Sequence, residues 1–72
     1  MGSWKRDLKD GGRVEVYNYD KGRTVEGRYA IPLYVVDDAF TTGVTLTVDE
    51  AFSLAHELIQ QAMYAEDGNA ND

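Results

Sequence analysis

The chain contains no cysteine, which excludes a disulfide framework and any zinc site built on thiolates. It contains one histidine, His56, and has neither a glycine-rich phosphate loop nor a nucleophile elbow. No apolar run approaches the ~18 residues that a membrane-spanning helix needs, and no signal-peptide core is present. We therefore expect a cytoplasmic, non-enzymatic protein that binds no cofactor, metal ion or membrane.

Basic residues are missing from the second part of the chain. All seven Lys and Arg residues lie between Lys5 and Arg28, where five acidic residues leave a net charge of +2. Residues 29–72 carry eight acidic residues and no Lys or Arg, so the whole chain has a formal charge of −6. This asymmetry can steer a charged partner to one end of the molecule, or it can simply keep a helix surface solvated.

Residues 43–65 predict a short strand that leads directly into a long amphipathic helix. Thr47 and Glu50 have the spacing of a capping box, and Asp49 adds negative charge to the first turn, where the helix dipole favours it. Apolar residues then recur at helical spacing and form one broad stripe. The stripe consists of Val48, Ala51, Phe52, Leu54, Ala55, Leu58, Ile59, Ala62 and Met63.

Residues 13–19 and 23–31 alternate apolar and polar side chains and predict a hairpin with Lys21-Gly22 at its turn. This register pairs Val16 with Gly27 and Glu15 with Arg28. It leaves one face of the sheet open to a partner, with two tyrosines and mixed charge. That face would carry Arg13, Glu15, Tyr17, Tyr19, Thr24, Glu26, Arg28 and Ala30.

The segment after the only proline, Pro32, is apolar on both sides. Pro32 lacks an amide donor, so we expect it at an edge, a bulge or a break between strands. The apolar residues 33–36 would be covered either by the N-terminal arm or by a second copy of the chain, and we favour a homodimer. The acidic pair Asp37-Asp38 can bind a hard cation weakly, but we favour a role in turn solubility.

The fold class we predict is α+β, with three antiparallel strands packed against one C-terminal helix, or four strands if Pro32 divides the second one. Residues 1–12 would form an N-terminal arm or an irregular strand, residues 13–66 a single domain and residues 67–72 a disordered acidic tail. Trp4, in the arm, would pack at the core edge or anchor a partner. The predicted core comprises Val14, Val16, Val25, Tyr29, Leu33, Val35, Val44, Leu46, Phe52, Ala55, Leu58, Ile59 and Ala62.

Two resemblances add to this interpretation. The stretch G-V-T-L-T-V-D-E-A-F-S-L-A-H-E-L-I-Q-Q-A resembles the strand-then-helix ending of many small proteins of actinobacteria and their phages, which have no assigned chemistry. The order of hairpin, third strand and helix is similar to the AP2-like arm-binding domains of phage integrases, which lay an open sheet face in DNA. That similarity would assign DNA contacts to Arg13, Lys21, Arg23 and Arg28. Glu15 and Glu26 on the same face depart from the basic patch of such a domain.

The leading functional hypothesis is a small protein-interaction module, phage-encoded or accessory, that binds a host protein and self-associates. In one version its acidic helix face imitates the charge of a nucleic acid. The candidate partner-binding residues are Tyr17, Tyr19, Arg28, Tyr34, Val36, Glu50 and Glu57. A DNA-binding sheet is the alternative, and a third hypothesis is an enzyme subunit in which a dimer mate completes a site at His56.

Overall fold

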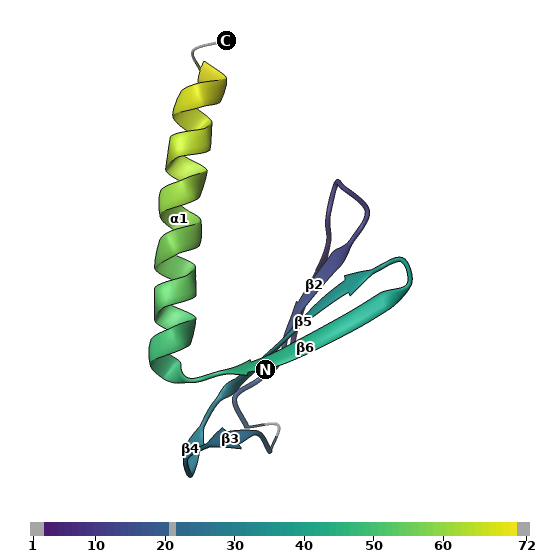
Figure 1. The fold of residues 1–72 in the computed structure, drawn as a ribbon, viewed down its shortest axis with the longest axis vertical. Helices are drawn as coiled ribbons and strands as arrows, with labels where there is room; N and C mark the ends of the chain where they lie inside the picture. The colour runs from purple at the N-terminus through teal and green to yellow at the C-terminus, as the bar shows by residue number, and fades with distance from the viewer. Residues whose placement is uncertain (1–2, 21, 71–72) are drawn as a thin grey trace.

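The computed structural model describes residues 3–20 and 22–70, and it is an α+β structure with an antiparallel sheet and one C-terminal helix (Figure 1). The strand order in the main sheet is β1-β2-β5-β6, and β3 and β4 form a separate small hairpin. The elements are β1 (Trp4–Asp7), β2 (Arg13–Val16), β3 (Thr24–Val25), β4 (Arg28–Tyr29), β5 (Ile31–Asp37), β6 (Phe40–Leu46) and α1 (Val48–Ala70).

The four strands of the main sheet are joined as a meander, with the β3–β4 hairpin inserted between β2 and β5. The β1–β2 turn is closed by a 2.7 Å hydrogen bond from the Leu8 amide to the Gly12 carbonyl, and Gly11 adopts a φ of 106°. Glycine reaches this left-handed region without a steric cost. In the β5–β6 turn, the Asp38 amide donates to the Asp37 carboxylate at 2.8 Å.

The predicted hairpin register is wrong. β2 pairs with β1 and β5, so that Val16 lies opposite Trp4 and Leu33 rather than Gly27. Residues 24–29 pair with each other instead, across a turn at Glu26-Gly27. Lys21, at the predicted turn, lies outside the described residues. Alternation fixes which side chains share a face but does not select the partner strand, and β5, which is longer and apolar on both sides, can also pair with β2.

Of the expected alternatives, the N-terminal residues form a strand, and a break between strands lies close to the proline. Residues 4–7 form β1, the edge strand beside β2, which raises the main sheet to four strands. Pro32 is the second residue of β5, in the interior of the sheet rather than at an edge strand, and its carbonyl accepts the Tyr17 amide at 3.0 Å. The chain breaks between β4 and β5 at Ala30, whose exposed fraction is 0%.

The capping box at the start of α1 is confirmed. The Glu50 amide donates to the Thr47 hydroxyl at 3.2 Å, and the Thr47 amide donates to the Glu50 carboxylate at 2.9 Å. The helix continues to Ala70, so residues 67–70 are helical rather than a disordered tail. The rest of the predicted tail, residues 71–72, lies outside the described part of the chain.

The expectation that the helix packs across the sheet is wrong. α1 contacts the sheet only near its start at β6, and then diverges from it (Figure 1). No described residue of α1 is buried, and the exposed fraction is 72% for Phe52 and 61% for Leu58. The radius of gyration is 14.6 Å, whereas a compact chain of this length has about 11 Å. The predicted core is therefore divided between two surfaces that do not touch.

Candidate functional site: an open apolar groove

The register of the main sheet places its large apolar side chains on one face, because alternate residues of each strand point the same way. Val14 lies opposite Val35, and Leu33 lies opposite both Val16 and Val44. We call this surface the apolar sheet face. Its members are Trp4, Val14, Val16, Ile31, Leu33, Val35, Phe40, Val44 and Leu46.

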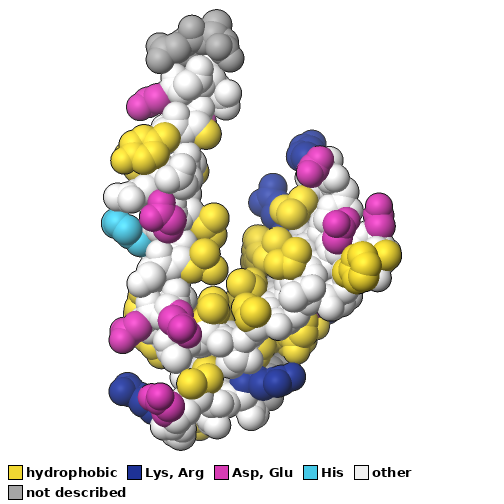
Figure 2. Space-filling model, viewed as in Figure 1, with side chains coloured by type: hydrophobic (Ala, Val, Ile, Leu, Met, Phe, Trp, Pro, Cys, Tyr) yellow, Lys and Arg dark blue, Asp and Glu magenta, His cyan; other side chains and the backbone are white. Residues whose placement is uncertain are grey.

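The apolar stripe of α1 stands opposite the apolar sheet face across an open hollow. Figure 2 shows hydrophobic side chains on both sides of this hollow, over the helix and over the sheet. Val35 and Val44, at the centre of the sheet face, have exposed fractions of 49% and 50%, and Ile59 on the stripe is 59% exposed. The two walls form what we call the apolar groove.

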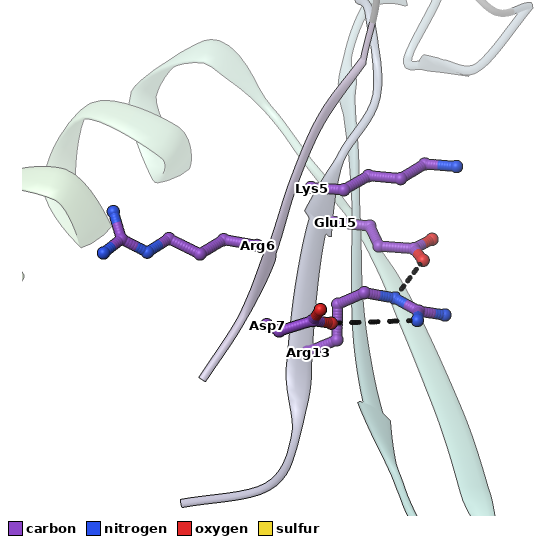
Figure 3. Close-up of a pocket in the computed structure, with 5 residues that line it drawn as sticks. All are labelled: Lys5, Arg6, Asp7, Arg13 and Glu15. Carbon is purple, nitrogen blue, oxygen red and sulfur yellow. Dashed lines mark hydrogen bonds and ion pairs between the residues drawn. The ribbon is translucent and has the colours of Figure 1, made fainter. Parts of the chain in front are cut away.

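The charged residues beside the groove are few, with Arg6 and Asp37 on the sheet side by register and Glu66 on the helix side. Arg6 points from β1 to the side opposite Lys5 and Glu15, which is the apolar side of the sheet (Figure 3). Glu66 follows Ala62 by one helical turn and Ile59 by two, so it lies in line with the stripe. Among residues 3–20 and 22–70, neither Arg6 nor Glu66 has an ion-pair partner within 4.0 Å.

The opposite face of the sheet is polar and is organised around Glu15, which is 8% exposed. The Arg13 guanidinium donates to one carboxylate oxygen of Glu15 at 2.8 Å (Figure 3). The Tyr17 hydroxyl donates to the other oxygen at 3.0 Å. The Tyr17 hydroxyl, and then Arg13, hold the pKa of Glu15 below its ordinary value. The same hydrogen bond raises the pKa of the Tyr17 hydroxyl.

Aromatic rings extend this polar face across the sheet. The rings of Tyr17 and Tyr34 lie 5.3 Å apart between centroids, and the Lys5 ammonium lies 5.6 Å from the Tyr17 ring centre. The Arg23 guanidinium donates to the Tyr34 hydroxyl at 3.4 Å. The side chains on this face are bonded mainly to each other, and they contribute to a structured surface rather than to an unsatisfied binding site.

The structure does not bring the predicted partner-binding residues together. Tyr17, Tyr34 and Val36 share the polar sheet face. Tyr19 packs edge-on against Tyr29, at 5.2 Å between centroids, away from the main sheet. The remaining three candidates, in β4 and on α1, are Arg28, Glu50 and Glu57.

The two glutamates among them, Glu50 and Glu57, already form hydrogen bonds within the helix or its cap. Glu50 accepts the Thr47 amide as part of the cap, and Glu57 accepts a 3.0 Å hydrogen bond from the Gln61 side-chain amide. Arg28 lines a hollow together with residues 47–49, where the β3–β4 hairpin meets the start of the helix. The acidic helix face is therefore partly a stabilising feature of α1 itself.

The residues considered for acid–base chemistry and cation binding, His56 and Asp37, lie on different elements, α1 and β5. No set of three His, Asp or Glu side chains is placed to hold a metal ion in the described ranges. His56 is exposed on α1, and one Asp37 carboxylate oxygen is already bonded to the following amide. In the same part of the chain, no helix combines the length and the apolar content that crossing a bilayer requires.

The sequence reasoning identified the apolar residues of the groove but assigned them to a closed core. It did not place Arg6 on the apolar side of the sheet, because it treated residues 1–12 as an arm. The alternation of Trp4 and Arg6 with Lys5 and Asp7 was the available signal for a strand. The comparisons with known proteins gave no match to a family model, a curated protein or a solved structure.

Proposed function

We propose that the chain is a non-enzymatic protein-interaction module and that the apolar groove is its binding surface. The observation that carries this proposal is the exposure of both walls, the apolar sheet face and the helix stripe, within one folded chain. Soluble monomers rarely expose a contiguous apolar patch larger than about 300–600 Å². Water contact with these walls is unfavourable, so a partner that covers them gains free energy from their burial.

The amount of exposed surface supports the same conclusion. The accessible surface of the chain is 6177 Å², whereas a compact monomer of this mass exposes about 4,500 Å². The difference, roughly 1,700 Å², is comparable to the total area buried in a standard protein–protein interface. The partner must therefore be large enough to fill a groove between a helix and a sheet, which favours a protein segment over a small molecule.

The polar sheet face gives the DNA-binding alternative less support. Glu15 lies at its centre, and the nearest guanidinium, that of Arg13, is already paired with it. DNA affinity depends on cations that are free to neutralise phosphates. Self-association and binding of another protein are both compatible with the groove, and both belong to the proposed function.

Small-angle scattering combined with light scattering tests the proposal. We expect either a complex whose mass exceeds that of one chain, or a monomer that stays extended, with a radius of gyration near 14.6 Å. In the complex the groove is available for contact between chains, and in the extended monomer it stays accessible to a partner. A compact monomer with a radius of about 11 Å would mean that α1 closes on its own sheet, and the proposal would then be wrong.

A further inference from the structure

We propose that the free edge of β6 is a second interaction surface, and that it pairs in antiparallel fashion with β6 of a second copy of the chain. This surface is separate from the apolar groove, so the inference goes beyond the proposed function. The two four-stranded sheets then join into one continuous sheet, with a twofold axis that passes beside Gly43.

The register identifies which backbone groups of β6 point out of the sheet. The Pro32 carbonyl accepts the Tyr17 amide, so the backbone groups of Pro32 face β2. Because successive residues of a strand face alternate neighbours, those of Leu33 face β6 and bond to its register partner there, Val44. The residues of β6 on either side of such bonded positions direct their amides and carbonyls away from β5. These are Thr41, Gly43 and Thr45.

No described segment pairs with these outward groups. β6 is an edge strand, and among residues 3–20 and 22–70 no backbone hydrogen bond between elements or in a turn involves residues 41–45 outside the β5 ladder. α1 leaves the end of β6 on the apolar side of the sheet and then diverges from it (Figure 1). A row of free donors and acceptors at a sheet edge has the geometry that a further β-strand requires. The occupant is therefore a strand.

The two edges of the main sheet differ in their protection against pairing. β1 has four residues, of which three are charged, and short charged edge strands discourage a further strand. β6 has seven residues, none of them charged and none a proline, and its register with β5 runs without a bulge. Pairing of β1 with β6 would be head-to-tail and would continue from copy to copy, whereas pairing of β6 with β6 closes after two copies. The unprotected edge therefore favours a dimer.

The β6 edge is complementary to itself. When Gly43 lies opposite Gly43 of the second copy, Thr41 of each copy lies opposite Thr45 of the other. All the outward residues then face each other, and each facing pair can exchange two backbone hydrogen bonds. A twofold axis perpendicular to the sheet also keeps the apolar sheet faces of both copies on the same side, so the joined sheet has one apolar face and one polar face.

Phe40 favours a second copy of the chain over an unrelated strand. Its exposed fraction is 74%, and its register partner in β5 is the acidic residue Asp37. In the self-paired register, Phe40 lies opposite Leu46 of the second copy in a non-hydrogen-bonded pair, where cross-strand side chains approach most closely. Phe40 thereby gains an apolar neighbour on the side where its own sheet ends.

Amide hydrogen exchange of the natural chain tests the pairing without any substitution. We expect the amides of residues 41, 43 and 45 to exchange at least tenfold more slowly at high protein concentration, where the dimer forms, than at high dilution. The matched control is the β1 edge, where by the same alternation the amides of Lys5 and Asp7 point outward and should exchange rapidly at both concentrations. Exchange at the three β6 positions that does not depend on concentration would overturn the inference.

A disulfide tests the register, because the natural chain has no cysteine to interfere. In the self-paired edge, Thr42 lies opposite Val44 of the second copy with their Cα atoms about 4.5 Å apart, which is within the range of about 4.4–6.8 Å that a disulfide bridges. A ¹⁵N-labelled Thr42→Cys variant is mixed with an unlabelled Val44→Cys variant, refolded and oxidised. We expect the mixed disulfide to exceed the disulfide of either variant with itself at least tenfold by mass spectrometry. Arg6→Cys, which would face itself if β1 edges paired, is the control and should stay a single chain of 8.0 kDa.

The outcomes separate this inference from the proposed function. A dimer whose β6 amides stay unprotected and whose mixed disulfide does not form overturns edge pairing, and it leaves the apolar groove as the contact between copies. A monomer with a radius of gyration near 14.6 Å also overturns edge pairing and leaves the groove accessible to another protein. A dimer with protected β6 amides in which α1 closes on its own sheet supports edge pairing and contradicts the function proposed for the groove.

Discussion

The ring of Tyr34 covers Gly43 on the neighbouring strand, and the two residues are direct partners in the β5–β6 register. A Cβ added at position 43 would lie 2.6 Å from the Tyr34 Cδ1 atom, closer than real Cβ contacts allow. We therefore predict that Gly43→Ala destabilises the fold by about 1–3 kcal/mol, the usual range for overpacking. Chemical denaturation followed by circular dichroism measures the change.

A double-mutant cycle checks the cause of that loss. In a Tyr34→Ala background the ring is absent, so Gly43→Ala should cost at least 1 kcal/mol less than in the natural chain. Gly68→Ala is the matched control, because a Cβ there meets no atom within 4 Å. Equal costs of Gly43→Ala in both backgrounds would contradict the covering role of Tyr34.

A second prediction concerns pH. The pKa of Glu15 is lowered from 4.5, chiefly by the Tyr17 hydroxyl, so the ionised carboxylate stabilises the folded state. This contribution is present above the unfolded pKa and is lost as the pH falls through the lower, folded pKa. The pKa of Tyr17 is raised from 10.0 by the same bond, so its contribution is lost as the pH rises above 10.

Tyr17→Phe removes that hydrogen bond and keeps the ring. We expect the variant to lose less stability than the natural chain both below pH 4.5 and above pH 10, and we expect its Glu15 pKa to move back toward 4.5 in a carboxyl NMR titration. Tyr29→Phe is the control, since Tyr29 packs only against Tyr19 in the described contacts. An unchanged Glu15 titration in Tyr17→Phe would refute the assignment.

A third prediction follows from the tight turn of the small hairpin. Glu26 has a φ of 53° and Gly27 a φ of 76°, both in the left-handed region that a type I′ turn requires. Asn tolerates this region better than Glu, so Glu26→Asn should stabilise the fold by roughly 0.5–1 kcal/mol. Glu26→Ala is the control: it shortens the side chain without relieving the backbone, and its melting temperature should not rise.

The sequence predicted local features correctly where a single local mechanism decides them. The capping box formed by Thr47 and Glu50 is one such feature, since hydrogen bonds between near neighbours determine it. The grouping of Val14, Val16, Leu33 and Val35 on one face is another, because alternation fixes it whatever the partner strand. The α+β class followed from these two signals.

The sequence did not determine which distant segments pair or pack. β2 paired with β5 instead of residues 23–31, because the alternation within β2 sets its faces without selecting the strand beside it. The stripe of α1 predicted burial but not the surface that buries it, which within one chain is absent. A pattern can thus predict which residues share an apolar face without predicting whether the same chain covers it.

A fourth prediction tests the helix cap. Thr47→Ala removes the hydroxyl acceptor of the Glu50 amide, and we expect a loss of about 1 kcal/mol, with reduced amide protection in the first turn of α1. Ser53→Ala, on the exposed side of the helix, is the control and should cost nothing. The cap also means that reversing the charge of Glu50 disturbs the helix start, so partner binding by the acidic helix face is better tested at Glu57.

The last prediction concerns how stability depends on concentration. If two chains associate through the apolar groove, unfolding is coupled to dissociation, and the melting temperature must rise with protein concentration. Leu58→Gln places a polar group on the stripe, at a position that is 61% exposed within one chain. In a monomer it should therefore change stability by no more than about 0.5 kcal/mol, as surface substitutions usually do.

In a dimer formed through the apolar groove, the same residue is buried against the second copy. Leu58→Gln should then lower the melting temperature at high concentration and weaken dimerisation at least tenfold in light scattering, while the isolated chain keeps its helical circular dichroism signal. Gln61→Ser, on the same helix but off the stripe, controls for changes in the helix itself. A melting temperature of the natural chain that does not depend on concentration, together with a monomeric mass, would contradict self-association through the groove, because burial of the stripe between copies necessarily makes stability depend on their concentration.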